Sequence, residues 1–325
     1  MANVYRFHQL GGPDVLQLDQ LEISAPEANE ARVRIKSIGL NRADIMFRNN
    51  QYILKAQLPS RIGYEIINVG SGVKDFKVGD AVCILPPDDL GRYGTYADEM
   101  NIAAEFLVHK PGKLSWEEAS SVWMQYLTAW GGLIHTAQIK KDDFVLITAA
   151  SSSVGIAAIQ IVKQAGAIAI AAVLGRDKNE ILFSMGADYV IATDEEDLLT
   201  ELTKITGSEG LAAAFDAVAG PQVNEIALAL KKFGKLVIHG ALSPEDTPFP
   251  LKLAIRKSLS ISGYLFDEIL NDPILRERAK KFIIDGLNAG TLIPCIDAVF
   301  SFDEMRDAQT YLENHRRFGK VVVTV

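Results

Sequence analysis

The sequence predicts an α/β protein of two domains, one β-rich and one built on a doubly wound parallel sheet. Short strand-like runs separated by glycine and proline fill the first third of the chain. Residues 144–173 have the pattern of a strand, a tight turn, a helix and a second strand. Strands and helices then alternate for on the order of a hundred further residues, and 325 residues exceed the size of most single domains.

The first domain is expected to span residues 1–120. Residues 31–38 alternate apolar and polar side chains, as a strand with one buried face does. Ser115 and Glu118 have the spacing of a capping box, which predicts a helix that continues to residue 126 and leads into the second domain.

The centre of the second domain is a predicted strand–helix–strand crossover. Residues 144–147 form an apolar run without polar alternation, which is typical of a strand buried on both faces of a parallel sheet. A turn of small residues follows at 148–155, then a helix pattern to residue 165 and a second buried strand at 168–173. The turn lies at the carboxyl end of the first strand, where dinucleotide-binding folds hold the pyrophosphate.

Small residues in such a turn let backbone N–H groups approach phosphate closely, with the helix N-terminus facing the negative charge. Against the pattern G-x-G-x-x-G the chain offers Ala150, Ser152 and Gly155, so only the last glycine is present. Turns of small residues also occur where a helix simply packs closely on a sheet, so the loop alone leaves both interpretations open. The candidate cofactor-binding residues in the loop are Ala150, Ser151, Ser152, Ser153, Val154 and Gly155.

The remaining pattern completes the sheet and then returns to the first domain. Thr193 and Glu196 have capping-box spacing, which predicts a helix that ends at Gly207. The second domain is assigned to residues 121–265, and residues 266–325 are assigned to the first. Further strands are expected at 212–215, 236–238, 259–261, 297–300 and 321–323, and further helices at 221–231 and 273–288.

Composition narrows the possible partners. The net charge of −8 disfavours nucleic acid or an anionic membrane as the main partner. No apolar run approaches the roughly twenty residues of a membrane span, and the N-terminus lacks a signal-peptide pattern, so we expect a cytoplasmic protein. Cys83 and Cys295 are far apart, and the five histidines show no metal-ligand spacing, so no metal site is expected.

Four ordered stretches, at 39–44, 78–82, 127–130 and 185–191, resemble the zinc-independent quinone oxidoreductase branch of the medium-chain dehydrogenase/reductase superfamily. The resemblance covers essentially the whole chain. It implies a GroES-like β-rich catalytic domain, a Rossmann domain, a cleft between them, NADPH as hydride donor and a homodimer.

The resemblance also implies site residues in the first domain. Asn41 and Tyr64 stand where zinc-dependent relatives have a cysteine and a histidine ligand, so catalytic zinc is not expected. Asn41, Asp44 and Tyr52 match polar residues at the substrate mouth and are the catalytic candidates. Tyr52 is the candidate hydrogen-bond and proton donor; the alternatives are an aromatic that only packs at the rim, and water as the proton source.

On the cofactor side, the resemblance places Thr128, Gly240, Ala241, Leu265 and Phe266 near the nicotinamide, and it adds Phe318 and Lys320 to the cofactor-binding set. The adenosine end is assigned to Gly175, Arg176, Lys178 and Thr193.

The end of the second crossover strand predicts NADPH. Residues 173–175 include no Asp or Glu for the ribose hydroxyls of NAD, whereas Arg176 and Lys178 supply charge for a 2′-phosphate. Asp177, between them, is expected to face solvent. The alternative is a solvated turn with ordinary surface charges. Two features depart from the family: Asp194 would repel a phosphate that it faced, and the segment after Glu65 is several residues shorter than usual.

A chain without a metal motif, a catalytic serine motif or a reactive cysteine pair has few routes to chemistry except through a bound cofactor. The leading hypothesis is NADPH-dependent hydride transfer to a small electrophilic substrate, a quinone or an α,β-unsaturated carbonyl. The alternatives are reduction of 2-enoyl thioesters, or an NADPH-binding structural or sensor protein with little turnover.

Overall fold

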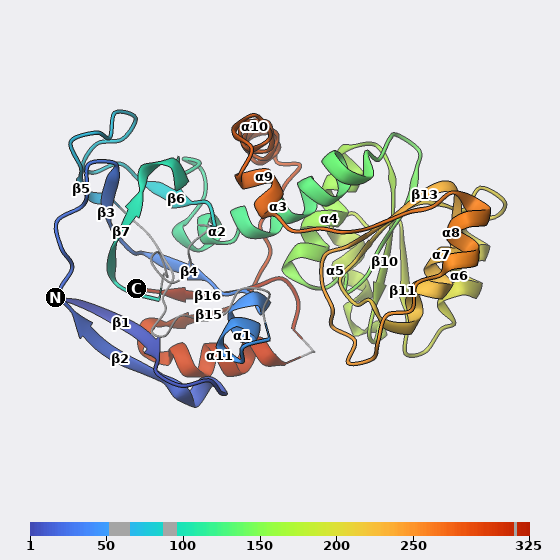
Figure 1. Cartoon of the computed structure of the whole chain (residues 1–325), viewed down its shortest axis with the longest axis horizontal. Helices are drawn as coiled ribbons and strands as arrows, with labels where there is room; N and C mark the ends of the chain where they lie inside the picture. Colours follow the sequence, from blue (N-terminus) through green and yellow to red (C-terminus); the bar gives the residue numbers. More distant parts are fainter. Residues whose placement is uncertain (52–65, 87–95, 315–316) are drawn as a thin grey trace. The chain divides into compact units, whose positions relative to one another are not determined.

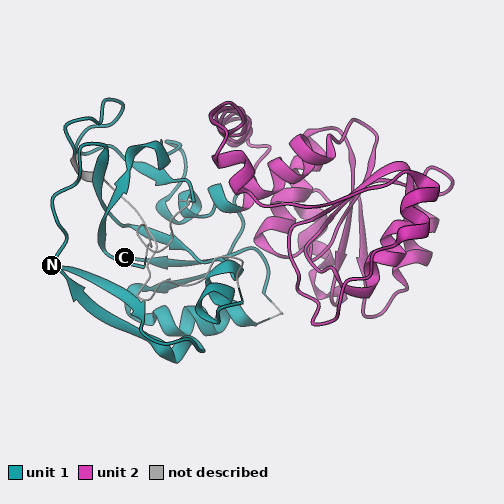
Figure 2. Cartoon of the chain, in the orientation of Figure 1, with its two compact units in different colours: residues 1–124, 294–325 teal, residues 125–293 magenta. Residues whose placement is uncertain are grey.

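The computed structural model describes residues 1–51, 66–86, 96–314 and 317–325 (Figure 1). The chain forms two compact units (Figure 2). Unit 1 comprises Met1–Met124 and Pro294–Val325, and unit 2 comprises Gln125–Ile293.

Unit 2 contains a six-stranded parallel sheet with the strand order β11-β10-β9-β12-β13-β14. The chain begins the sheet at β9 in the middle, builds β10 and β11 to one side, and then crosses to build β12, β13 and β14 on the other. The order therefore reverses between β9 and β12, which is where doubly wound sheets bind ligands at the carboxyl ends of their strands. The strands are β9 (Phe144–Ile147), β10 (Ile168–Val173), β11 (Tyr189–Ala192), β12 (Leu211–Asp216), β13 (Leu230–Ile238) and β14 (Ser260–Gly263).

Helices connect these strands. Alpha-helix α3 carries the chain from unit 1 into unit 2 and continues into a π-helical segment, Gly131–Ala137. The helices are α3 (Trp123–Trp130), α4 (Ser153–Gln164), α5 (Asn179–Ser184), α6 (Leu198–Thr206), α7 (Val223–Ala229), α8 (Leu251–Lys257), α9 (Asp267–Leu270) and α10 (Pro273–Ala289).

The structure confirms the predicted crossover: β9 and β10 have the expected bounds, and α4 ends within one residue of position 165. Alpha-helix α4 begins earlier than expected, at Ser153, so its first turn lies within the segment predicted as the loop. The predicted capping box of α6 is wrong. Asp197 is the N-cap, accepting a hydrogen bond from the backbone N–H of Thr200 at 2.8 Å. The Glu196 carboxylate instead accepts from the N–H of Ala192, at the end of β11.

Unit 1 is built from small sheets around one apolar core. Strand pairs β1–β2 and β6–β8 are antiparallel, β3 lies between β5 and β7, and β16 lies between β15 and β4. The strands are β1 (Ala2–Phe7), β2 (Leu16–Leu21), β3 (Glu30–Arg34), β4 (Ser37–Gly39), β5 (Ile66–Val69), β6 (Val82–Ile84), β7 (Glu99–Ala103), β8 (Leu107–His109), β15 (Ile296–Ser301) and β16 (Lys320–Thr324). The helices are α1 (Arg42–Arg48), α2 (Trp116–Ser120) and α11 (Met305–Glu313).

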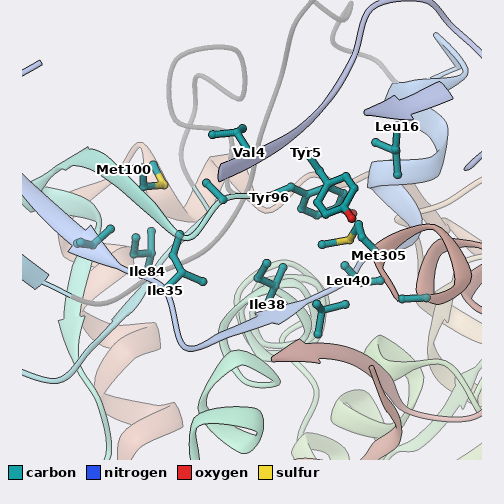
Figure 3. Close-up of a cluster of buried hydrophobic side chains, with 14 of the residues drawn as sticks. Val4, Tyr5, Leu16, Ile35, Ile38, Leu40, Ile84, Tyr96, Met100 and Met305 are labelled. Atoms are coloured by element: carbon teal, nitrogen blue, oxygen red, sulfur yellow. The ribbon is translucent and has the colours of Figure 1, made fainter. Parts of the chain in front are cut away.

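Side chains from both ends of the sequence meet in this core. Val4 and Leu16 from the N-terminal strands pack in the same cluster as Ile38 of β4 and Met305 of α11 (Figure 3). Beta-strand β16 pairs antiparallel with β4, which ties the C-terminal segment to the segment that precedes α1. The predicted strand at 31–38 is interrupted, because β3 ends at Arg34 and β4 begins at Ser37.

The chain returns to unit 1 at Pro294, whereas the sequence-based division placed the return at residue 266. A pair of hydrogen bonds explains why the C-terminal end of α10 remains with unit 2. Gln160 of α4 donates to the carbonyl of Ile293 at 3.0 Å and accepts from its N–H at 2.9 Å. None of the described helices is both long and apolar enough to cross a lipid bilayer.

Candidate functional site

The predicted phosphate-binding loop lies at the carboxyl end of β9, beside the point where the strand order reverses. Ala149 has a φ of 47°, which turns the chain sharply, and Ser152 then caps α4 by accepting from the N–H of Gly155 at 3.0 Å. The first-turn N–H groups of a helix have no partner inside the helix. With Gly155 satisfied by the cap, the N–H groups of Ser153 and Val154 are the ones available to an anion.

Gly155 is required by close packing. A Cβ added there would lie 2.6 Å from both Cα and the carbonyl oxygen of Ala150, and 2.7 Å from the carbonyl oxygen of Ala149. The loop therefore folds directly over the start of α4, as the last glycine of a dinucleotide-binding loop allows. By this observation the loop fits a dinucleotide pyrophosphate.

The sequence analysis missed a buried hydrogen-bonded pair beside this loop. Thr148 donates its hydroxyl to the carboxylate of Asp216 at 2.6 Å and accepts from the N–H of Ala217 at 2.9 Å. Asp216 has no exposed surface and also accepts from the N–H groups of Val218 and Ala219, each at 3.0 Å. The pair joins the loop after β9 to the loop after β12. An acid directly after the predicted strand at 212–215 was the available signal.

At the end of β10 the predicted adenosine-side residues do lie together. Gly175, with a φ of 77°, donates its N–H to the carboxylate of Asp194 at 2.7 Å. Arg176 forms ion pairs with Glu195 at 2.9 Å and Glu196 at 3.0 Å.

Two other residues of this end make local contacts. Lys178 is buried and donates to the carbonyl of Leu174 at 3.3 Å. The hydroxyl of Thr193 donates to the carbonyl of Val173 at 3.3 Å.

The nicotinamide-side candidates lie in the same unit. Thr128 is buried on α3, Gly240 and Ala241 follow β13, and Leu265 and Phe266 lie between β14 and α9. A Cβ on Gly240 would lie 2.7 Å from the carbonyl oxygen of Ala217, so this loop also makes a close backbone approach.

The imidazole of His239, which the sequence analysis left without a role, follows β13. It stacks on Phe215 with ring centroids 3.8 Å apart. Burial lowers the pKa of His239 to about 3, so the ring is neutral at physiological pH.

In unit 1, Asn41 and Asp44 form the start of α1. Asn41 is the N-cap, and its backbone N–H donates to the Asp44 carboxylate at 2.7 Å. The side chain of Asn41 is held at both ends, because Lys320 donates to Oδ1 at 2.5 Å and Nδ2 donates to the carbonyl of Gly39 at 3.1 Å. Lys320, at the start of β16, is only 1% exposed.

A chain of hydrogen bonds continues from Asp44 into the interior of unit 1. The Tyr96 hydroxyl donates to the Asp44 carboxylate at 3.1 Å and accepts from the side-chain amide of Gln309. Arg48 donates to Gln309 at 2.8 Å and pairs with Glu313 at 2.6 Å. The side chains that support Asn41 and Asp44 are thus themselves fixed by buried polar contacts.

Burial shifts two pKa values in this cluster in opposite directions. It raises the pKa of Asp44 to about 6, against the opposing effects of the Asn41 N–H and the Lys320 charge. It lowers the pKa of Lys320 to about 7, against the opposing effect of Asp44. Tyr96, Arg48 and Arg317 are the other ionisable groups that act on the pair.

These shifts predict a biphasic dependence of stability on pH. The folded-state pKa of Asp44 lies above its usual 3.8, so the free energy of unfolding should fall as the pH rises from about 4 to 6. The folded-state pKa of Lys320 lies below its usual 10.5, so the unfolded state binds more protons from about pH 7 to 10.5 and stability should rise there. Urea unfolding across pH tests this: Asp44→Asn should remove the acidic fall and Lys320→Met the alkaline rise. Variants that retain both slopes would refute the assignment.

Tyr52, Tyr64 and Phe318 are the remaining residues named in the sequence analysis. Tyr52 and Tyr64 lie outside the described residues. Phe318 precedes β16, and its N–H donates to the carboxylate of Asp297 at 3.3 Å. Within the described part of the chain, no group of three or more His, Cys, Asp or Glu side chains could hold a metal ion.

Comparison with known proteins gives matches to both units. Residues 153–279 match the family described as zinc-binding dehydrogenase, and residues 27–112 match the alcohol dehydrogenase GroES-like domain. Quinone oxidoreductase 1 of Escherichia coli (strain K12) is 33% identical over 275 residues, which cover 82% of this chain and 83% of that protein. A 2-haloacrylate reductase from a Burkholderia species is 26% identical over 327 residues, 97% of each protein.

Solved structures of a quinone oxidoreductase and of an enoyl reductase also match the chain. The Escherichia coli quinone oxidoreductase complexed with NADPH matches with a TM-score of 0.90 at 28% identity, over 99% of this chain and 100% of the other. The CurK enoyl reductase matches with a TM-score of 0.87 at 26% identity, over 99% of both chains. Together the matches define an NAD(P)H-dependent oxidoreductase with a GroES-like and a Rossmann-like domain. The chain belongs to the quinone oxidoreductase branch of the medium-chain dehydrogenase/reductase family.

Proposed function

We propose that the protein uses NADPH to reduce a quinone or an α,β-unsaturated carbonyl, without zinc. The observation that carries the cofactor part is the loop closed over α4 at Gly155, beside the reversal of strand order. The relatives' names support the substrate part, since quinones, 2-haloacrylate and enoyl groups are all electron-poor unsaturated compounds.

Different residues are proposed to bind the cofactor and the substrate. When bound, the reduced nicotinamide supplies a hydride. The first-turn N–H groups of α4 bind the pyrophosphate, and the neighbouring loops orient the rest of the cofactor. Asn41 donates from Nδ2 to the substrate oxygen, where negative charge develops during reduction. Tyr52 is the proposed second donor, and the proton comes from its hydroxyl or from water.

Zinc independence rests on the donor set. Asn41 supplies an amide where a zinc site needs a thiolate, and amide oxygen is a poor ligand for zinc. The ammonium of Lys320 lies 2.5 Å from that amide oxygen and would repel a divalent cation. Both features disfavour a catalytic zinc at this position.

Oxidation of NADPH and NADH against quinones, enones and 2-enoyl thioesters tests the function. We expect turnover of quinones or enones that survives chelator treatment. The likeness to an enoyl reductase structure favours 2-enoyl thioesters as the second candidate. Tight NADPH binding without turnover of any acceptor would refute the proposal and favour a binding or sensor role. Stoichiometric zinc that is lost together with activity would refute zinc independence.

The preference for NADPH is proposed to depend on Arg176 and Lys178. A 2′-phosphate would replace the two glutamates as the partner of Arg176, whose side chain is 56% exposed. Replacing Arg176 and Lys178 by Ala should raise the KM for NADPH about tenfold or more, the cost of losing one charge-assisted contact, and change that for NADH far less. Lys281→Ala, an exposed lysine of the same unit, is the control. Equal effects on both cofactors would contradict this assignment.

A homodimer is proposed through the β14 edge of the sheet in unit 2. Among the strands that the structure describes, β14 pairs only with β13, and none of the residues of α8, the helix that precedes β14 in the sequence, is buried. Ile255 on α8 is 73% exposed. Ile255→Asp should shift the protein from dimer to monomer in sedimentation velocity, while Ile274→Asp, an equally exposed site on α10, should not. A monomeric parent protein would rule the dimer out.

A further inference from the structure

We propose that Lys320 is a positioning residue for catalysis, which acts through the Asn41 amide to stabilise negative charge on the substrate oxygen. The inference rests on the proposed function and gives the Lys320 side chain a role other than direct cofactor binding. It identifies the substrate atom at Asn41 as a hydrogen-bond acceptor on which charge accumulates.

The orientation of the Asn41 amide follows from its two partners. The oxygen and nitrogen of an Asn side chain can be exchanged by a flip, so their assignment needs partners of known polarity. Below its pKa of about 7 Lys320 is an ammonium, which only donates, so the atom that faces it is Oδ1. A carbonyl only accepts, so the atom that faces Gly39 is Nδ2. Both contacts specify the same orientation, and with the residues that the structure describes the group left for a ligand is the second N–H of Nδ2.

The buried polar end of Lys320 donates to the Asn41 amide oxygen and is attracted by the charge of Asp44. The residue is 1% exposed, and burying an ammonium is unfavourable unless it is paired. Its backbone is fixed because β16 pairs with β15 and the N–H of Lys320 donates to the carbonyl of Cys295 at 2.9 Å. A methyl-terminated side chain of similar length would pack there without the desolvation cost. The lysine therefore has a use beyond packing.

The positive charge of Lys320 makes the Asn41 amide a stronger hydrogen-bond donor. A hydrogen bond from a cation to the amide oxygen polarises the amide and strengthens the N–H that it donates elsewhere. Addition of hydride to an enone or a quinone moves an electron pair onto the substrate oxygen, which is protonated afterwards from water or a side-chain hydroxyl. The Asn41 amide connects Lys320 to that oxygen, so the positive charge of Lys320 stabilises the negative charge that develops there.

The proposal is tested by a double-mutant cycle on kcat/KM with Lys320→Met and Asn41→Ala. Lys320→Met should lower kcat/KM for an enone about tenfold to a hundredfold, less than the loss of a complete oxyanion donor, with the Kd for NADPH unchanged. In the Asn41→Ala background it should change kcat/KM by less than about twofold, because the group through which it acts is gone. Additive effects would overturn the proposal. Lys257→Met, which removes a partly buried cation that donates to backbone carbonyls in unit 2, should show additivity with Asn41→Ala.

Ligand binding measured in the absence of turnover is a second test of the role of Lys320. The probe is 2,4-dinitrophenolate, an oxyanion at neutral pH whose absorbance reports binding, and 2,4-dinitroanisole is the neutral control. The parent protein should bind the phenolate at least about fivefold more tightly than Lys320→Met, a difference of about 1 kcal/mol, and should bind the anisole equally. Equal phenolate affinities, or no binding to the parent protein, would overturn the proposal. Lys320-dependent phenolate binding without turnover of any acceptor would refute the proposed activity but support the role of Lys320.

Discussion

Gly155→Val is expected to abolish cofactor binding and to destabilise unit 2. The first added carbon would lie 2.6 Å from two backbone atoms of Ala150, and the valine adds two further methyl groups. Because the obstructing atoms are backbone atoms, the loop must move as a whole, away from the first turn of α4. We expect a loss of about 3 kcal/mol or more in the free energy of unfolding and at least about a hundredfold in the Kd for NADPH.

Urea unfolding and fluorescence titration with NADPH would measure both effects. Gly112→Ala is the matched control, because a Cβ there meets no atom within 4 Å and its φ lies outside the left-handed region. The control should change stability and cofactor affinity little. If Gly155→Val binds NADPH normally, the loop after β9 is a packing feature and the cofactor site must be sought elsewhere.

Asp216→Ala is the second variant expected to have a large effect. It removes a fully buried carboxylate and leaves the Thr148 hydroxyl and the N–H groups of Val218 and Ala219 without their acceptor. Unsatisfied buried donors are costly, so the free energy of unfolding should fall by about 3 to 5 kcal/mol. The loops after β9 and β12 would also separate, so NADPH affinity should fall.

Thr148→Val tests the same contact from the other side and should cost about 1 to 3 kcal/mol. The double variant should lose less than the sum of the two, because both changes break one interaction. Asp285→Asn, which removes only an exposed ion pair with Lys281, should have almost no effect. Strictly additive losses would show that the two side chains contribute independently.

The strand, loop and helix at 144–165 were predictable because the information is local. The apolar run of β9, the small residues after it and the single glycine at 155 lie within twelve consecutive positions, 144–155. Their periodicity reports burial directly. Local patterns are ambiguous where two neighbouring acidic residues are both spaced to cap the same helix. Glu196 has capping-box spacing from Thr193, yet Asp197 caps α6 and Glu196 bonds to the end of β11.

The contacts around Asn41 could not be predicted in this way. Lys320 is 279 residues from Asn41 in the sequence and reaches it only because β16 pairs with β4. From the sequence Lys320 was assigned to cofactor binding by resemblance, and neither its burial nor its partner was visible. The extent of unit 2 was similarly hidden, since it depends on the contact between Gln160 and Ile293, 133 residues apart.

By itself the sequence determined the α/β class and the crossover at 144–173, because these follow from side-chain periodicity within short segments. The close approach of Ala149 and Ala150 that requires a glycine at position 155 became visible in the structure. Only the tertiary structure decided that Thr148 is bound to Asp216 and that Lys320 holds the Asn41 amide. A buried polar group must find a partner, but which partner depends on strands that come together after the chain has reversed direction.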